Sequence, residues 1–254
     1  ISTCRSPQEM FGALLKEEAR MNAEKDRAEG KEPKKTMVVS IMPCTAKKAE
    51  ITRPEHYTDG EQNVDYVLTT TEITRMIQEA GIDLAQVQPE ALDMPFGLAS
   101  GAGAIFGVTG GVTEAVLRRL VNSSRAEDLE EISFSGIRGV DGIKEAKVNL
   151  NGREVKIAVV NGLHCAEDLL EKMKAGEVHY DFVEVMACKR GCIAGGGQPV
   201  PIGPRTKKAR LEGIYKIDNM AQIKLSNENP IITEVYAGIL KGKEHKLLHN
   251  EMNV

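Results

Sequence analysis

The sequence predicts an α/β fold, and three observations support that prediction. Short β-branched apolar runs alternate along the chain with segments whose apolar residues have helical spacing. Asn151-Gly152 separates two of these runs, as in a two-residue hairpin turn. Hydrophobic residues make up 41% and charged residues 28% of the 254 positions, which is typical of a globular chain with a substantial core.

The composition argues against two classes of partner. The 33 Lys and Arg residues and 37 Asp and Glu residues give a net charge of −4, and aromatic residues are only 4% with no Trp. Neither a basic footprint nor stacking platforms for a nucleic acid are therefore expected. The longest weakly polar stretch, 96–108, is too short and too rich in Gly to span a bilayer.

The five cysteines indicate thiol chemistry rather than a disulfide framework. Their number is odd, and the chain is long for a disulfide scaffold, so reduced thiols or metal ligands fit better. The sequence begins at Ile1 without an initiator Met or a signal peptide, and we interpret it as a piece of a longer protein. A cytoplasmic location is expected, with the periplasm as the alternative.

A helix is expected near the N-terminus, followed by a buried strand. Ser6 can cap the helix, Pro7 suits its first position, and Glu9 completes a capping box. The charged run 24–35 reads as a solvated helix end and loop, with a partner-binding patch as the alternative. The run 36–41 is β-branched and apolar, and it delivers Met42-Pro43-Cys44 at its carboxyl end, where sites form on open α/β sheets.

The remaining elements follow from caps, turns and periodicity. Helices are expected to begin at 69–72 and end at Gly81, and to cover 113–120 and 166–174, the last ended by Gly176. The expected strands are 132–135, 146–150, 155–160 and 181–185. The last strand delivers Cys188 as the first delivers Cys44, and the chain reads mostly as helix from residue 205 onward.

Cys188 and Cys192, followed by Gly195-Gly196-Gly197, form the sharpest local signal. Thiolates are soft ligands for iron–sulfur clusters, zinc or copper(I), and the glycines would let the main chain approach a bulky cofactor. The spacing alone does not establish a metal site. The alternative is that Cys188 and Cys192 are two small buried residues, because a Cys outside a disulfide packs as a small hydrophobe.

Cys44 precedes Lys47 and Lys48, whose charges favour a thiolate that could act as ligand or nucleophile. An ordinary Cys at a strand end is the alternative. Cys4 and Cys165 are expected to be structural or inert. The glycine-rich run 101–107 does not fit a nucleotide-binding loop, because no clear strand precedes it. His245 and His249 do not fit a zinc-protease motif, because no Glu stands beside the first His.

Two longer motifs resemble signatures of the iron-iron (FeFe) hydrogenase family. Met42–Glu50 (MPCTAKKAE) is similar to the second signature, and Glu184–Pro199 (EVMACKRGCIAGGGQP) is similar to the third. Further stretches in the same order, 6–12, 100–107, 110–112 and 229–249, also resemble the family. The resemblance covers nearly the whole chain.

The resemblance implies a two-lobed α/β catalytic domain with mixed or parallel sheets flanked by helices. Residues 1–204 would be the C-terminal portion of the large-subunit domain, and 205–254 a small-subunit-like helical tail. The implied cofactor is the H-cluster, a 4Fe-4S cubane joined to a diiron subcluster with CO, cyanide and a bridging dithiolate. The implied reaction is 2H⁺ + 2e⁻ ⇌ H₂.

Site residues are carried over by motif. Cys44, Cys188 and Cys192 would ligate iron, and Lys47 would donate a hydrogen bond to a cyanide. Ser2 matches a proton-path position. The implied lining of the diiron pocket is Met42, Met186, Gln8, Pro43, Phe106 and Gly107.

The chain departs from the family pattern in two ways. The family's first signature, with the fourth cubane Cys, would lie upstream of the position matching Ile1. Lys189 and Arg190 stand where the family often has Pro-Gly, which puts two cations beside the expected cluster and leaves room for a sensory member. The implied partners are H₂, protons, the upstream segment, and a ferredoxin-like donor or accessory iron–sulfur domains. A non-hydrogenase homologue acting in iron–sulfur assembly is the second alternative.

Overall fold

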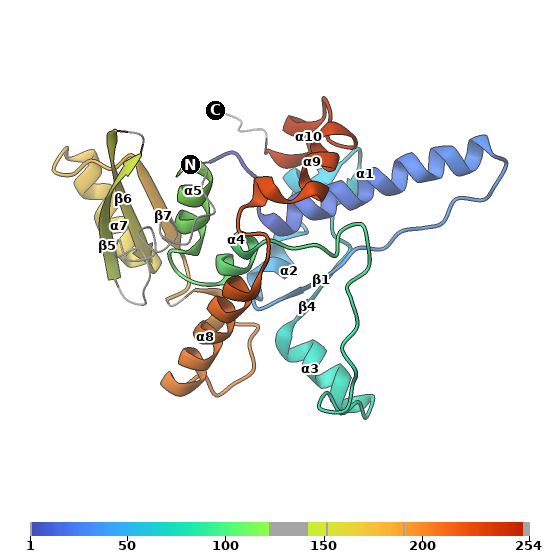
Figure 1. The fold of residues 1–254 in the computed structure, drawn as a ribbon, viewed down its shortest axis with the longest axis horizontal. Coiled ribbons are helices and arrows are strands. Elements are labelled where there is room, and N and C mark those ends of the chain that lie inside the picture. Colours follow the sequence, from blue (N-terminus) through green and yellow to red (C-terminus); the bar gives the residue numbers. More distant parts are fainter. Residues whose placement is uncertain (1, 122–141, 151, 190, 251–254) are drawn as a thin grey trace. The chain divides into compact units, whose positions relative to one another are not determined.

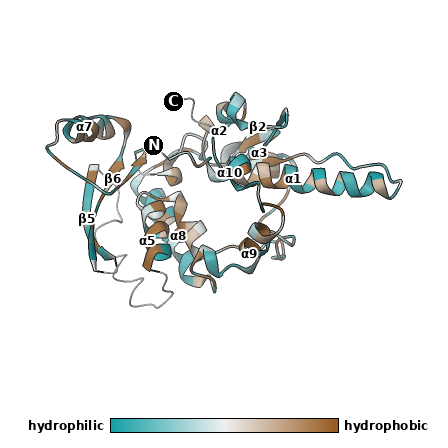
Figure 2. Cartoon of the chain, turned by 90° about the horizontal axis from the view of Figure 1, so that it is seen from above, coloured by the Kyte–Doolittle hydropathy of each residue, from teal (hydrophilic) through white to brown (hydrophobic). Residues whose placement is uncertain are grey.

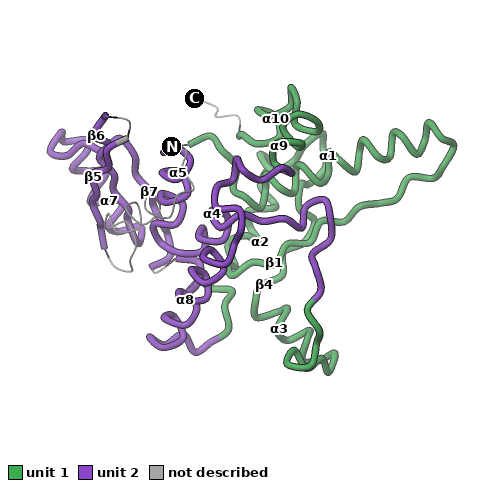
Figure 3. The backbone as a smooth tube through the Cα atoms, in the orientation of Figure 1, with its two compact units in different colours: residues 1–89, 196–199, 232–254 green, residues 90–195, 200–231 purple. Residues whose placement is uncertain are grey.

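The computed structural model describes residues 2–121, 142–150, 152–189 and 191–250, which form two compact units (Figure 3). Unit 1 contains residues 1–89, 196–199 and 232–254, and unit 2 contains residues 90–195 and 200–231. The units are defined by contacts rather than by family boundaries, so the division at residue 204 stays a prediction. The strand expected at 132–135 lies outside the described residues.

Unit 1 is built around one long helix and a small parallel sheet (Figure 1). Its elements are α1 (Pro7–Ala28), β1 (Val39–Met42), α2 (Ala46–Glu50), η1 (Pro54–His56), β2 (Tyr57–Thr58), β3 (Glu61–Gln62), β4 (Tyr66–Thr69), α3 (Thr70–Glu79) and α10 (Glu244–Leu248). The helix α9 (Pro230–Ala237) begins at the end of unit 2 and continues into unit 1.

The two helices expected from capping signals are confirmed. The Ser6 hydroxyl accepts from the Glu9 amide with Pro7 in the first turn, and Thr69 and Glu72 form a reciprocal capping box at the start of α3. The C-terminal half of α1 is largely hydrophilic (Figure 2), which agrees with a solvated helix end.

The first expected strand is shorter and more exposed than predicted. It begins at Val39 rather than at residue 36, and it pairs in parallel with β4, with Val39 opposite Tyr66 and Met42 opposite Thr69. Val39 and Ile41 are 50% and 54% exposed, because only the other face of this two-stranded sheet packs on a core. The sequence analysis missed β4, since four residues that end in a helix cap carry little pattern.

The unit 1 core lies on the covered face of that sheet. Its buried members are Val38, Ile51, Val64 and Val67, and Leu15 of α1 and Met42 pack against them. Parallel sheets are normally buried on both faces, so the half-covered pair is unusual.

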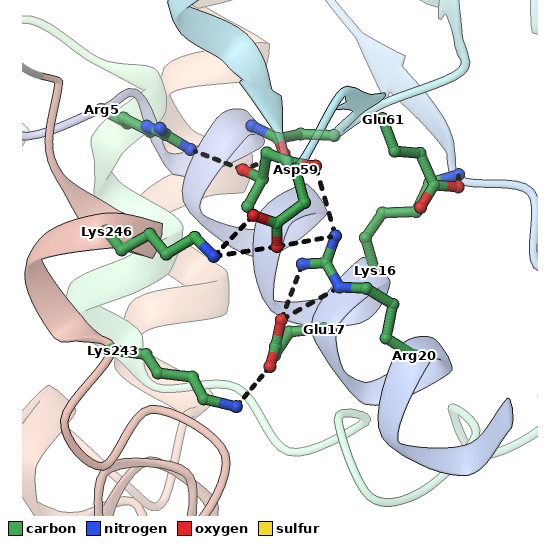
Figure 4. Close-up of polar contacts among 10 residues, drawn as sticks. Arg5, Lys16, Glu17, Arg20, Asp59, Glu61, Lys243 and Lys246 are labelled. Carbon is green, nitrogen blue, oxygen red and sulfur yellow. Dashed lines mark hydrogen bonds and ion pairs between the residues drawn. The ribbon is translucent and has the colours of Figure 1, made fainter. Parts of the chain in front are cut away.

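Charged side chains fasten the C-terminal segment of unit 1 to α1 and to the β2–β3 turn (Figure 4). Lys243 contacts Glu17 at 2.5 Å, and Lys246 contacts Asp59 at 2.7 Å. The hydrogen bond from Lys246 lowers the pKa of Asp59. Burial works to raise the pKa of Glu17, but hydrogen bonds from Lys243 and Arg20 outweigh it and lower that pKa.

Unit 2 contains a three-stranded mixed sheet with helices on both faces. Its elements are α4 (Gly101–Ala104), η2 (Ile105–Gly107), α5 (Gly111–Val121), β5 (Gly142–Leu150), β6 (Arg153–Asn161), α7 (Leu163–Lys174), β7 (Phe182–Met186), η3 (Cys192–Ala194), α8 (Pro204–Met220) and η4 (Ser226–Glu228). β6 lies in the middle, antiparallel to β5 and parallel to β7. Leu150 pairs with Arg153, as the expected hairpin requires.

Alternating residues of β6 pack on opposite helices. Ile157 and Val159 join Leu117 of α5, whereas Ala158 and Val160 join Leu169 of α7. A buried ion pair joins α8 to α5. Arg118 of α5 contacts Asp218 of α8 at 2.7 Å and Glu114 of its own helix at 2.6 Å. Burial opposes the charge of Arg118, but its hydrogen bonds to Asp218 and the charges of both carboxylates outweigh burial and raise the pKa of Arg118.

No helix in the described part of the chain is long and apolar enough to cross a membrane.

Candidate functional site

Each unit carries its cysteine motif at the carboxyl end of a strand. In unit 1, β1 ends at Met42, and Pro43 and Cys44 follow directly before α2. In unit 2, β7 ends at Met186, and Cys188 follows two residues later. These placements confirm the expected strand ends, and each half of the candidate site is described below within its own unit.

The loop that bears Cys44 is covered by Gly197, the end of the other motif. The Gly197 amide donates to the Pro43 carbonyl at 3.1 Å, and the Gly197 carbonyl accepts from the amide and hydroxyl of Thr71 at 2.9 and 3.0 Å. A Cβ on Gly197 would lie 2.8 Å from the Cys44 nitrogen and 2.9 Å from the Pro43 carbonyl carbon. Only glycine allows this approach of one main chain to the other.

Lys47 is held by the carboxylate of Glu50, which also accepts from a hydroxyl of unit 1. Its Nζ lies 2.8 and 2.6 Å from the two carboxylate oxygens of Glu50, and the Ser6 hydroxyl donates to Glu50 as well. Lys47 and Glu50 side chains are 22% and 18% exposed. The ammonium therefore has a fixed position close to the Cys44 loop.

Lys48 points to a different partner. It pairs with Glu72 at 2.9 Å, at the first turn of α3. The backbone hydrogen bond from Thr69, together with the bonds from Lys48 and the Thr69 hydroxyl, lowers the pKa of Glu72 to about 2. The two lysines of the motif are thus separated, and only Lys47 shares a carboxylate with Ser6.

Gln8 is buried and both ends of its amide are engaged. Its Oε1 accepts from the Ser40 hydroxyl at 2.8 Å, and its Nε2 donates to Glu9 at 3.2 Å. Ser40 belongs to β1, two residues before Met42, so Gln8 is tied to the strand that carries the motif. Ser2 is exposed, and its hydroxyl accepts from the Cys4 amide at 3.2 Å.

The loop that bears Cys188 and Cys192 packs on the segment 107–109 of the same unit. The Gly191 amide donates to the Cys188 carbonyl at 3.1 Å, which closes the turn between the two cysteines. Gly191 has φ of +74°, and a Cβ there would lie 3.0 Å from the Thr109 nitrogen and 3.1 Å from the Gly107 carbonyl oxygen. Phe106 directly precedes this segment and is 36% exposed.

α8 holds the far end of that loop, because Arg210 donates to the Ile193 carbonyl at 2.8 Å. Lys189 is exposed, and its aliphatic stem lies beside Gly162. Arg190 lies outside the described residues, so the expected effect of the two cations on a cluster stays a prediction.

The donor chemistry fits an iron–sulfur cofactor, because a strand-end loop of each unit presents cysteine thiols. None of the five cysteines, all of which lie among the described residues, forms a disulfide, and Cys44 and Cys192 are half-buried whereas Cys188 is exposed. Among the described residues, no three His, Cys, Asp or Glu side chains gather in a group that could hold a metal ion. The three candidate thiols are divided, one in unit 1 and two in unit 2, so neither unit alone supplies a complete set.

The spare cysteines lie elsewhere within their units. Cys165 packs against the core beneath α7. Cys4 forms an isolated bridge with His249, and its Sγ lies 3.9 Å from the Nδ1 of that ring. His249 is half-buried and bonded to the Thr3 hydroxyl at 2.8 Å.

Two carboxylates of this region were not among the predicted site residues. Glu50 holds Lys47, and buried Glu184 bonds to the start of α5. The sequence does mark Glu184 as unusual, because it is a charged residue in an otherwise apolar strand.

Family models match the chain in two consecutive stretches. The C-terminal domain of the iron-only hydrogenase large subunit matches residues 1–196, and the iron hydrogenase small subunit matches residues 204–251.

The chain is similar to hydrogenases and to an assembly factor. It is 42% identical to the NADP-reducing hydrogenase subunit HndD of Solidesulfovibrio fructosivorans, over 98% of this chain and 42% of that protein. It is 30% identical to the cytosolic Fe-S cluster assembly factor narfl of Danio rerio, over 99% of this chain and 62% of that protein. The chain thus spans less than two thirds of either relative.

A solved structure of the apo FeFe-hydrogenase HydA1 from Chlamydomonas reinhardtii matches with a TM-score of 0.76 and 35% identity. The match covers 98% of this chain and 69% of that one. The α/β fold expected from the sequence is thereby confirmed.

Proposed function

We propose, on the premise that this chain belongs to the family of the C-terminal domain of iron-only hydrogenase large subunits, that it houses most of an H-cluster site. In the proposed reaction, protons and electrons combine reversibly to form H₂. A fourth cysteine, which the first signature of the family carries, would complete the ligand set.

The observation that carries the proposal is the packing of Gly197 on Pro43 and Cys44. These residues come from the two family motifs, about 150 positions apart in the sequence. A glycine is required there by a backbone contact, so the end of the third motif lies on the second. Only four residues separate Cys192 from Gly197 in the sequence.

Cys44, Cys188 and Cys192 would hold the cubane through their thiolates. When bound, the H-cluster supplies the redox chemistry and the site at which H₂ forms or splits. Soft thiolates at strand ends suit iron.

The other residues would shape the cavity and handle charge. Glu50 fixes the Lys47 ammonium, which can donate a charge-assisted hydrogen bond to an anionic cyanide ligand. Met42, Met186 and Phe106 would exclude water with soft apolar surface, together with Pro43, Gly107 and the amide-engaged Gln8. Ser2, which is exposed, would exchange protons with solvent at the outer end of a path.

A second candidate function is cluster assembly without hydrogenase activity, and the similarity to the Danio rerio assembly factor supports it. The chain retains Lys47, Met42 and Met186, which a cubane-only protein does not need, so we favour the hydrogenase. An H₂-sensing role is a third reading. A ferredoxin-like donor or accessory iron–sulfur domains would exchange electrons, in the cytoplasm or the periplasm.

The ligand assignment is tested by iron content after anaerobic reconstitution with iron and sulfide. Single Cys→Ser changes at Cys44, Cys188 and Cys192 should each lower bound iron strongly, because a four-iron cubane needs its thiolates. Cys165→Ser is the matched control, since Cys165 belongs to α7 and packs against the core between that helix and the sheet, and the variant should bind as much iron as the wild type. An equal loss from Cys165→Ser, or no loss from the other three, would refute the assignment.

A further inference from the structure

Glu184 is a buried carboxylate on an apolar face of the unit 2 sheet. It is 6% exposed and lies in β7 between Phe182 and Met186. Alternate residues of a strand share a face, and Phe182 packs with Leu117 of α5, so Glu184 is directed to the α5 side. A charge at such a position breaks the apolar pattern of the strand, which is typical of positions kept for a purpose other than packing.

The carboxylate is satisfied by the first turn of α5. One oxygen accepts from the Gly110 amide at 2.8 Å, and the other accepts from the amide and hydroxyl of Thr113, each at 2.7 Å. Amides at a helix start have no partner within the helix, and the helix dipole favours an anion there. Glu184 thus caps α5 from a different element.

The capped segment also carries the cysteine turn. Gly110 directly follows the stretch 107–109, on which Gly191 rests with no room for a Cβ. The stretch 107–113 therefore contacts the third motif twice, at Glu184 before Cys188 and at Gly191 before Cys192.

We propose that Glu184 is a positioning residue, whose carboxylate fixes the segment 107–113 and through it the turn that presents Cys188 and Cys192. Without the carboxylate, Gly110 and Thr113 lose their acceptor, the segment shifts, and the Gly191 turn loses its support. The inference depends on the proposed function only for the statement that these two thiols bind iron.

Glu184→Gln tests the carboxylate at nearly constant volume. Each carboxylate oxygen faces one backbone amide, so a side-chain amide must direct its NH₂ group at one of these donors in either orientation. Glu154→Gln is the matched control, because Glu154 lies on β6 of the same sheet but pairs with Lys147 at the surface. Leu169→Ala is the control for lost stability, because it opens the core on the opposite face of the sheet.

The first measurement is amide hydrogen exchange of the full, metal-free chain under native conditions. Glu184→Gln should exchange severalfold faster at Gly110, Thr113 and Gly191, while Glu154→Gln matches the wild type and Leu169→Ala acts mainly on α7. Faster exchange at Gly110 and Thr113 with unchanged Gly191 would overturn the proposal, because Glu184 would then be a helix cap only. If Glu184→Gln does not fold, Thr113→Ala, which removes only the hydroxyl donor, should give a smaller increase at the same three amides, and no increase would overturn the proposal.

The second measurement is the electron paramagnetic resonance spectrum of the reduced, reconstituted cluster. Glu184→Gln should change the cluster signal and hasten iron loss to a chelator, whereas Glu154→Gln should do neither. Unchanged signal and retention would overturn the proposed link to the thiols. A wild type that takes up no iron, with the exchange pattern as expected, would refute the proposed function and leave the positioning of the turn intact.

Discussion

The two cysteine loops begin alike and are supported differently. Both follow the carboxyl end of a strand that pairs in parallel with a neighbour. Within unit 2, the Cys188 loop is supported by a sheet covered on both faces, the segment 107–109 and α8. The Cys44 loop extends from a two-stranded sheet with one exposed face and is covered by Gly197, a residue far along the chain.

The difference shows how one kind of motif can be held by local or by distant sequence. In unit 2, the loop follows a packed sheet and lies on the segment 107–109, which leads into a helix start bonded to the buried carboxylate of Glu184. In unit 1, the loop packs against Gly197, which lies about 150 positions further along the chain. The stretch that matches the iron hydrogenase small subunit, 204–251, contributes helices to both units. The ion pairs that hold it within each unit can therefore be compared.

The largest expected loss of stability comes from breaking the ion pair that holds residues 204–231 within unit 2. Asp218→Ala should lower the free energy of unfolding by about 3–5 kcal/mol, because Arg118 would remain buried with part of its pairing lost. Lys243→Ala in unit 1 should cost only about 1 kcal/mol, since Lys243 is 44% exposed and Glu17 keeps Arg20. Urea unfolding measures both, and equal losses would show that the two attachments do not differ.

A smaller effect is expected at the glycine that covers Cys44. Gly197→Ala should cost about 1–3 kcal/mol, because the new methyl group would meet backbone atoms that cannot move independently. Gly213→Ala in α8 is the control, as none of the described atoms lies within 4 Å of its Cβ position. Gly213→Ala should instead raise the free energy of unfolding by about 0.5–1 kcal/mol, because Ala has a higher helix propensity than Gly. Thermal unfolding of both variants measures the difference, and a neutral Gly197→Ala would contradict the close packing.

The smallest effect concerns pH and the pair next to the Cys44 loop. The pKa of Glu72 in the fold, about 2, lies below its ordinary value of 4.5. Ionised Glu72 therefore stabilises the start of α3 above pH 4.5, and this contribution is lost as the pH falls toward about 2. A Glu72→Gln variant should show a weaker dependence of unfolding free energy on pH across that window. An unchanged dependence would mean that Glu72 titrates normally.

The sequence predicted the parts of the site that depend on local chemistry. Caps at Ser6 and Thr69, the hairpin near Gly152 and the strand ends before Cys44 and Cys188 all follow from residues close in sequence. Other features depend on residues that are 27 to about 150 positions apart. They are the pairing of β4 with β1, the packing of Gly197 on Cys44, and the hydrogen bonds of Glu184 to the start of α5. Periodicity carries no information on such pairings, and a four-residue strand carries little of its own.

The roles of the site residues rest on the motifs and on the geometry of each unit. Glu50 and Glu184 illustrate what motifs alone leave out, because each acts on a neighbour that the sequence does not identify. Lys47 would need Glu50 to keep its direction, and the Cys188 turn would need Glu184.

The central claim, that the chain houses an H-cluster, is tested most directly by infrared spectroscopy of the protein after expression with hydrogenase maturation factors. The account predicts sharp bands in the metal carbonyl and cyanide region, from wild type and from a Cys165→Ser variant, and their loss in Cys192→Ser. A protein with a full cubane iron content but no such bands in any sample would contradict the claim and favour the assembly function.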